Sequence, residues 1–135
     1  MTDLARQLVE HPRWRWRART VALRHVPGNR DHGLRTTVTE RLLGHGWFDG
    51  GVPHVPDLDD HATQGVLLGM LREAMAPHVY ENTTTISVSR RARAGENGGH
   101  WDCDVADHYQ DWVSGEGHSE GEALARALLA AWGEM

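Results

Sequence analysis

Residues 59–88 read DDHATQGVLLGMLREAMAPHVYENTTTISV, and this stretch carries the patterns of both a helix and a strand. Asp59 and Asp60 place carboxylates where the free N–H groups at the start of a helix favour negative charge. Pro77 cannot continue a helix, and the β-branched run from Thr83 to Val88 favours a strand. We therefore expect a helix over about 60–76 and a strand over about 79–90. The expected apolar face of the helix consists of Ala62, Val66, Leu67, Met70, Leu71, Ala74 and Met75.

The residues after this strand predict a second hairpin and a final helix. The glycine-rich stretch 94–99 predicts a turn, and residues 100–113 alternate as the antiparallel partner strand. Ser119 and Glu122 have the spacing of a capping box at a helix start. The apolar stripe of this C-terminal helix is Leu124, Ala127, Leu128, Ala131 and Trp132, while one face of the preceding strand carries Trp101, Cys103, Val105 and Tyr109 and the other carries Asp102, Asp104, His108 and Gln110.

The residues before 59 predict a short helix and a first hairpin. Helical spacing over residues 2–10 ends before Pro12, and residues 13–17 alternate Arg with Trp at the period of a strand. The apolar residues lie at even positions in Trp14 and Trp16 but at odd positions in Val21 and Leu23. This change indicates a bulge or tight turn at residues 18–20. Residues 34–39 then predict the second strand of the hairpin. Residues 44–56 contain too many Gly and Pro for a regular element and predict a long surface loop.

Together these elements give the order α-β-β-α-β-β-α. We expect an α+β fold in which two hairpins form one antiparallel sheet of about four strands covered by helices. The length of 135 residues fits one domain over residues 1–135. An exposed edge of such a sheet could also pair two copies into a homodimer.

Composition excludes several classes of protein. The net charge of −5 argues against binding of bulk nucleic acid, which needs a basic surface. A single cysteine, Cys103, cannot form an internal disulfide and is expected to be a buried apolar residue rather than a nucleophile. Apolar runs are too short for a signal peptide or a membrane span. These features predict a cytoplasmic protein without a membrane partner.

The arginine-rich segment is the first candidate binding site. Guanidinium groups form bidentate hydrogen bonds with phosphates, and neighbouring aromatic rings can stack on nucleic-acid bases. Trp14 and Trp16, however, are expected to face the core. The alternative is a solvated strand face. The loop at 44–56 also carries two large aromatic side chains that either pack beneath it or anchor a partner. The candidate binding residues are therefore Arg13, Arg15, Arg17, Arg19, Trp47 and Phe48.

A second hypothesis is a metal-dependent enzyme. His100, Asp102, Asp104 and His108 would share one strand face, and these are usual ligand types. Their spacing fits no established metal or catalytic motif, and a solvated polar face explains the same pattern. The sequence thus favours a protein without catalysis, metal or cofactor, with the metal-dependent enzyme as the alternative.

Three stretches of the chain have the form of a helix cap or a helix face, or open the chain in a distinctive way. They are Pro56-Asp57-Leu58-Asp59-Asp60-x-Ala62-Thr63-x-Gly65-x-Leu67-Leu68, Gly121-Glu122-Ala123-Leu124 leading into Ala127-Leu128-Leu129-Ala130-Ala131, and His11-Pro12-Arg13-Trp14-Arg15-Trp16. In these motifs the chain resembles small uncharacterised phage and prophage proteins of α-β-α sandwich type. The resemblance implies a non-enzymatic accessory protein of the host bacterial cytoplasm. Such a protein would counter host defence as an inhibitor that binds a host defence protein, or by sequestering a phosphate-bearing signalling nucleotide. A virion or assembly protein is a further alternative.

Overall fold

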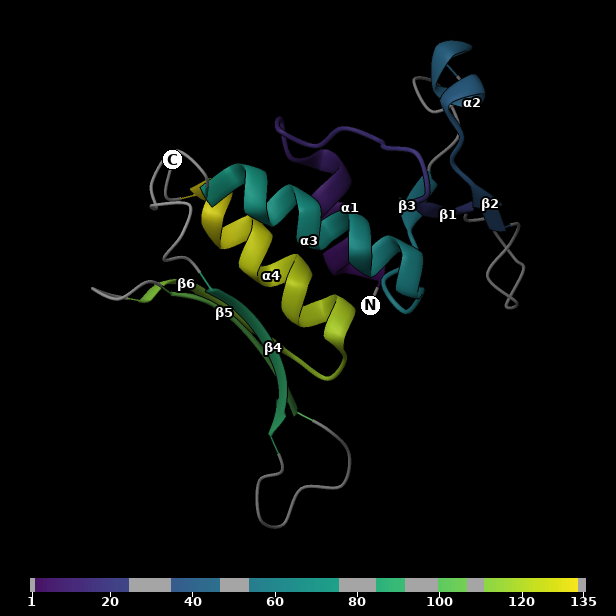
Figure 1. Cartoon of the computed structure of the whole chain (residues 1–135). Helices are drawn as coiled ribbons and strands as arrows, with labels where there is room; N and C mark the ends of the chain where they lie inside the picture. The colour runs from purple at the N-terminus through teal and green to yellow at the C-terminus, as the bar shows by residue number, and fades with distance from the viewer. Residues whose placement is uncertain are drawn as a thin grey trace. The chain divides into compact units, whose positions relative to one another are not determined.

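The computed structural model describes residues 2–24, 35–46, 54–75, 85–91, 100–106 and 111–133. The chain divides into two compact units, Met1–Val66 and Leu67–Met135, and each contains a three-stranded antiparallel sheet (Figure 1). The prediction of an α+β fold is confirmed. The prediction of one sheet of about four strands is wrong, because the two hairpins belong to separate sheets. The single-domain prediction stays a prediction.

The first unit is built on a sheet with the strand order β2-β1-β3. The predicted first hairpin is confirmed, because Val21 of β1 lies opposite Thr37 of β2 in antiparallel register. Helix α1 contacts β3 and buries Leu4, Ala5 and Leu8, as its helical spacing predicts. The elements of this unit are α1 (Thr2–Glu10), β1 (Val21–Arg24), β2 (Arg35–Thr37), α2 (Glu40–Gly44), β3 (His54–Pro56) and the start of α3 (His61–Met75).

The expected strand over residues 13–17 is wrong, since β1 begins only at Val21. The chain turns before it, as the Trp14 N–H donates to the His11 carbonyl at 3.0 Å. The guanidinium of Arg15 donates to the carbonyl of Trp14 at 2.8 Å, so local hydrogen bonds replace those of a sheet. The predicted tight turn at residues 18–20 is confirmed by the left-handed backbone of Arg19, whose φ is 81°.

The prediction of a loop over residues 44–56 is wrong at its C-terminal end, where residues 54–56 form strand β3. Val55 lies opposite Leu23, so β1 pairs with β3 along one edge and with β2 along the other. Pro56 fits there because β3 is an edge strand, where a missing N–H does not interrupt the sheet. The sequence patterns also missed α2, which begins where Thr39 Oγ1 accepts from the Leu42 N–H at 3.2 Å.

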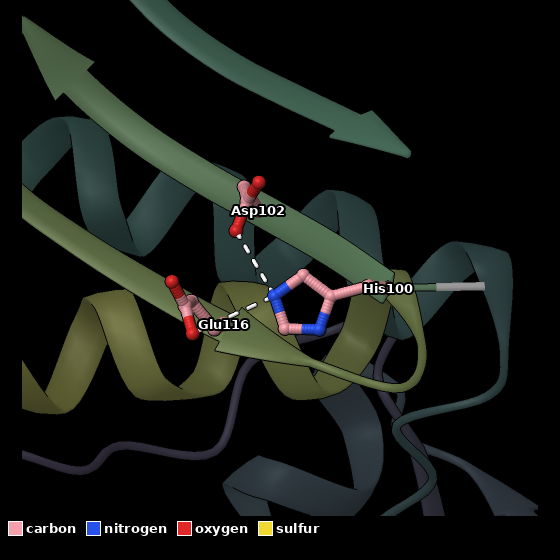
Figure 2. A group of neighbouring side chains, drawn as sticks. All are labelled: His100, Asp102 and Glu116. Carbon is pink, nitrogen blue, oxygen red and sulfur yellow. Dashed lines mark ion pairs between the residues drawn. The ribbon is translucent and has the colours of Figure 1, made fainter. Parts of the chain in front are cut away.

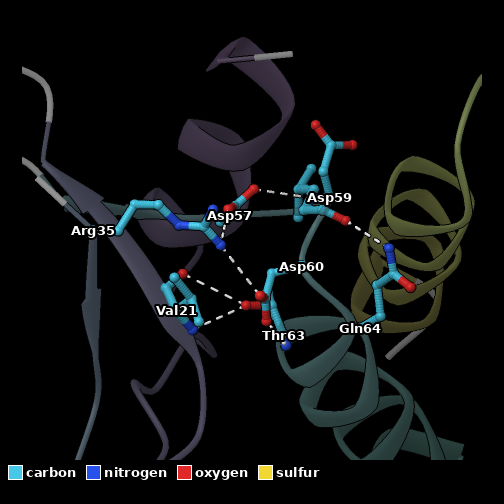
Figure 3. A network of polar contacts seen from close by, with 8 residues as sticks. Val21, Arg35, Asp57, Asp59, Asp60, Thr63 and Gln64 are labelled. Atoms are coloured by element: carbon cyan, nitrogen blue, oxygen red, sulfur yellow. Dashed lines mark hydrogen bonds and ion pairs between the residues drawn. The ribbon is translucent and has the colours of Figure 1, made fainter. Parts of the chain in front are cut away.

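The predicted central helix is confirmed as α3, and its first turn is tied to β1 (Figure 3). Asp60 caps the helix by accepting from the Thr63 N–H at 3.1 Å. Thr63 Oγ1 in turn accepts from the Val21 N–H at 2.9 Å, a buried hydrogen bond. Arg35 of β2 bridges two carboxylates, with N–O distances of 3.0 Å to Asp57 and 3.2 Å to Asp60. These contacts hold the start of α3 against the sheet of the first unit.

The second unit has the strand order β4-β5-β6, with α4 packed on one face (Figure 1). The predicted strand over 100–113 is in fact two strands, because residues 111–117 pair antiparallel with residues 101–106. The predicted antiparallel pairing of the strand over about 79–90 with the strand that starts at His100 is confirmed, with residues 85–91 opposite residues 100–106. The elements are β4 (Thr85–Arg91), β5 (His100–Ala106), β6 (Asp111–Gly117) and α4 (Glu120–Gly133).

Helix α4 begins and packs as its sequence predicts. Ser119 Oγ accepts from the Glu122 N–H at 3.2 Å, and the Glu122 carboxylate accepts from the His118 N–H at 2.9 Å. The helix lies so close to β6 that a Cβ on Gly115 would collide with backbone atoms of Ala123 and Ala127. All five residues of its predicted apolar stripe are buried: Leu124, Ala127, Leu128, Ala131 and Trp132.

Candidate metal centre

Three potential metal ligands meet on the face of the second sheet opposite α4. Asp102 of β5 lies directly across from Glu116 of β6 in the register. His100 precedes Asp102 by two residues, so their side chains emerge on the same face of β5. Alternation places Cys103 and Val105, both fully buried, on the other face. The antiparallel register thus brings one imidazole and two carboxylates together.

The ligand atoms of His100, Asp102 and Glu116 all lie within 4.8 Å of one another (Figure 2). Nε2 of His100 is 3.4 Å from Oδ1 of Asp102 and 3.5 Å from Oε2 of Glu116. Atoms bound at about 2.1 Å to a tetrahedral ion lie about 3.4 Å apart, from the usual zinc–nitrogen and zinc–oxygen distances. Both measured separations fit that geometry.

The three side chains differ in their exposure to solvent. The Asp102 side chain is 5% exposed and that of His100 is 15% exposed, whereas Glu116 is 60% exposed. Burial of a carboxylate is costly unless a cation or hydrogen bonds compensate it. The group of three ligands is therefore buried at Asp102 and exposed to solvent at Glu116.

The structure brings together only part of the predicted metal group. His100 and Asp102 meet, whereas Asp104 lies two residues further along the same face and outside the group of three. His108 lies outside the described residues. Glu116 was missed, although Ser114, Glu116 and His118 alternate with small or apolar residues, a pattern that indicates a strand.

The interpretation of this face as solvated is wrong for Asp102, which is buried. The reason is its central position, since β5 has neighbours on both sides and the paired residues Ser89 and Glu116 flank Asp102. Asp104 on the same strand is half-buried. A polar face therefore contains a carboxylate that is largely withdrawn from water.

The arginine segment forms no row on a strand. Arg13, Arg15 and Arg19 are exposed, and Arg17 is half-buried. Trp14 faces the core as expected, and half-buried Trp16 contacts it edge to face with ring centroids 5.3 Å apart. Trp47 and Phe48 lie outside the described residues. Binding of a partner by this segment stays a prediction.

Cys103 is fully buried on the face of β5 opposite the ligand group, which confirms its expected apolar role. Burial, reinforced by the nearby negative charge of Asp104, raises the pKa of its thiol to about 11. The thiolate is the reactive form, so the folded protein should react slowly with a thiol reagent such as DTNB at neutral pH. Unfolding in urea should restore the reactivity of an ordinary cysteine.

The same pKa shift should make stability depend on alkaline pH. The thiol of the unfolded chain ionises near its ordinary pKa of 9.0, while that of the folded chain stays neutral until about 11. The stabilising contribution is therefore complete below pH 9 and is lost as the pH rises toward 11. Unfolding curves across this range should show the loss, and Cys103→Ala should lack it. Rapid labelling of the native thiol would contradict the assignment.

No protein-family model matches the chain, no curated protein matches it, and no solved structure matches its fold. The resemblance to phage and prophage proteins accordingly stays a prediction. Among the described residues, no helix is both long and apolar enough to cross a membrane.

Proposed function

We propose that the protein binds a divalent transition-metal ion, with zinc preferred, through His100, Asp102 and Glu116. The observation that carries the proposal is the convergence of one imidazole nitrogen and two carboxylate oxygens within 4.8 Å. Imidazole nitrogen is a good ligand for zinc and its neighbours in the first transition row, whereas calcium and magnesium are held by oxygen alone. The mixed ligand set therefore favours zinc over those two ions.

The geometry around Nε2 of His100 supports a metal ion between the three groups. Within the described residues this atom is buried and forms no hydrogen bond. Charge-assisted hydrogen bonds from nitrogen to carboxylate oxygen are about 2.7–2.9 Å long. The separations of 3.4 and 3.5 Å exceed that range and match the spacing of ligands around an ion instead.

Bound zinc would join β5 to β6 and so act on the stability of the second unit. The unfolded chain does not hold His100 and Glu116 together, so metal binds the folded state preferentially. Such binding adds about 2.7 kcal/mol to folding stability when the free ion is at one hundred times its Kd. Zinc would also neutralise the two carboxylates, one of which is buried.

The proposal is tested by titrating zinc into chelator-treated protein, followed by calorimetry and thermal unfolding. We expect one ion per chain and a higher unfolding temperature with zinc, which EDTA reverses. His100→Ala should lower the affinity by at least about tenfold, since even residues behind the ligands contribute about 10–100-fold. Asp102→Asn should weaken binding with almost no change of shape.

His45→Ala is the matched control, because His45 is an exposed histidine that follows α2 in the other unit. It should bind zinc as the unchanged protein does. Circular dichroism of each variant reports whether the fold is kept. The proposal fails if the unchanged protein binds no zinc, or if His100→Ala and Asp102→Asn bind it with unaltered affinity.

A metal site is compatible with the predicted role as a non-enzymatic accessory protein, since it supports a binding surface without requiring catalysis. Capture of a host protein or a signalling nucleotide, and any metal-dependent catalysis, remain separate hypotheses. Exposed Arg13, Arg15 and Arg19 would take part in the capture of a host protein or a signalling nucleotide. Zinc binding is the function that the described contacts support best.

A further inference from the structure

We infer that His118 is the fourth ligand of the proposed zinc ion, which makes the centre a closed site of two histidines and two carboxylates. The inference rests on the proposed zinc binding at His100, Asp102 and Glu116. Those residues supply three ligands, whereas structural zinc sites have four protein ligands in tetrahedral arrangement. A closed structural site would therefore need one further protein ligand, from a residue beside the exposed edge of the group.

The strand register places His118 next to that edge. In the pairing of β5 with β6, Trp101 lies opposite Gly117. Gly117 is the last residue of β6 and His118 follows it, so the same register continued by one residue would set His118 opposite His100. Side chains directly across an antiparallel pair have Cβ atoms about 4.5–5.5 Å apart, which two imidazoles easily span. Figure 2 shows the His100 ring beside the strand that carries Glu116.

Burial along β6 gives the direction in which His118 emerges. Val113, Gly115 and Gly117 are buried, whereas Ser114, Glu116 and His118 are exposed. His118 follows the last residue of β6, and its exposure continues the alternation, which favours the face that carries Glu116 for its side chain. The imidazole of His118 lies outside the group of three ligands. Because it is exposed, a change of rotamer could turn it toward an ion bound between His100 and Glu116 without displacing a buried neighbour.

The backbone of His118 is already fixed in place. Its N–H donates to the Glu122 carboxylate at 2.9 Å, and the Ser119 side chain that follows caps α4. A ligand at residue 118 would therefore connect the zinc ion to the first turn of α4 as well as to β5 and β6. Four protein ligands would leave no position for water, so the ion would be structural rather than catalytic.

Cobalt(II) in place of zinc tests the inference, because its visible absorption is intense in tetrahedral sites and weak at higher coordination numbers. The chelator-treated full chain should give the intense spectrum with one equivalent of cobalt. His118→Ala should lower zinc affinity by at least about tenfold and shift the cobalt spectrum toward that of a site with bound water. His45→Ala should leave both measurements unchanged.

The outcomes separate this inference from the proposed function. If the unchanged protein binds zinc and His100→Ala weakens binding, but His118→Ala alters neither affinity nor spectrum, the fourth-ligand assignment is wrong and the zinc site stands. If neither metal binds the unchanged protein, both fall. Because His118 contributes its backbone N–H to Glu122, and alanine keeps that group, His118→Ala should remain folded by circular dichroism.

Discussion

Gly115→Ala is expected to lower the free energy of unfolding of the second unit by about 3 kcal/mol, the upper end of the range for overpacked sites. The added methyl group would collide with the Ala123 carbonyl oxygen and the Ala127 backbone nitrogen. These obstacles belong to the backbone of α4, so no rotamer change relieves them. Either α4 moves away from β6, or the strand bends. Urea unfolding followed by circular dichroism measures the loss.

Gly65→Ala provides the opposite result from the same chemical change. Gly65 lies inside α3, and a Cβ there meets nothing within 4 Å among the described residues. Alanine should therefore stabilise the protein by about 0.5–1 kcal/mol through its higher helix propensity. Equal effects of the two substitutions would contradict the close packing of α4 on β6.

Thr63→Val is expected to destabilise the first unit by about 1–3 kcal/mol, the cost of a buried donor without a partner. The substitution keeps the shape of the side chain but removes the oxygen that accepts from the Val21 N–H at 2.9 Å. Thr63 is fully buried, so water cannot replace that oxygen. Amide hydrogen exchange should therefore speed up at Val21, alongside a lower urea midpoint.

Thr63→Ser is the matched control, because it keeps the hydroxyl group and removes only a methyl group. It should preserve slow exchange at the Val21 amide while losing some apolar packing. If the valine variant protects that amide as well as the serine variant does, the hydrogen bond does not hold β1 to α3.

The helices could be predicted from the sequence because their signals are periodic and local. The stripe of α4 and the cap at Ser119 both lie within a few residues of the groups they contact. The alternation over residues 13–17 led to a wrong prediction of a strand. A few alternating residues cannot distinguish a strand from a turn, and here the Arg15 side chain donates to the carbonyls of Pro12 and Trp14. The alternation of residue types does not reveal these side-chain hydrogen bonds.

The candidate site could be predicted only in part, because it depends on pairing between strands. His100 and Asp102 share one strand, and spacing alone placed them on one face. Glu116 comes from β6, a strand that the sequence pattern did not separate from β5. Gly115 is required by the close approach of α4, which is a tertiary contact and leaves no local signal.

Alternate residues of strand β6 contact two different neighbours, helix α4 on one face and the proposed ion on the other. The number of residues in the strand therefore matters more for both contacts than the identity of most of its side chains. Its buried positions receive α4, and Glu116 faces the proposed ion. Loss or gain of one residue before Glu116 would exchange the two sets, turning the carboxylate into the helix contact and a glycine toward the ion. Variation in this segment should therefore occur by replacement, as at exposed Ser114, and not by insertion or deletion.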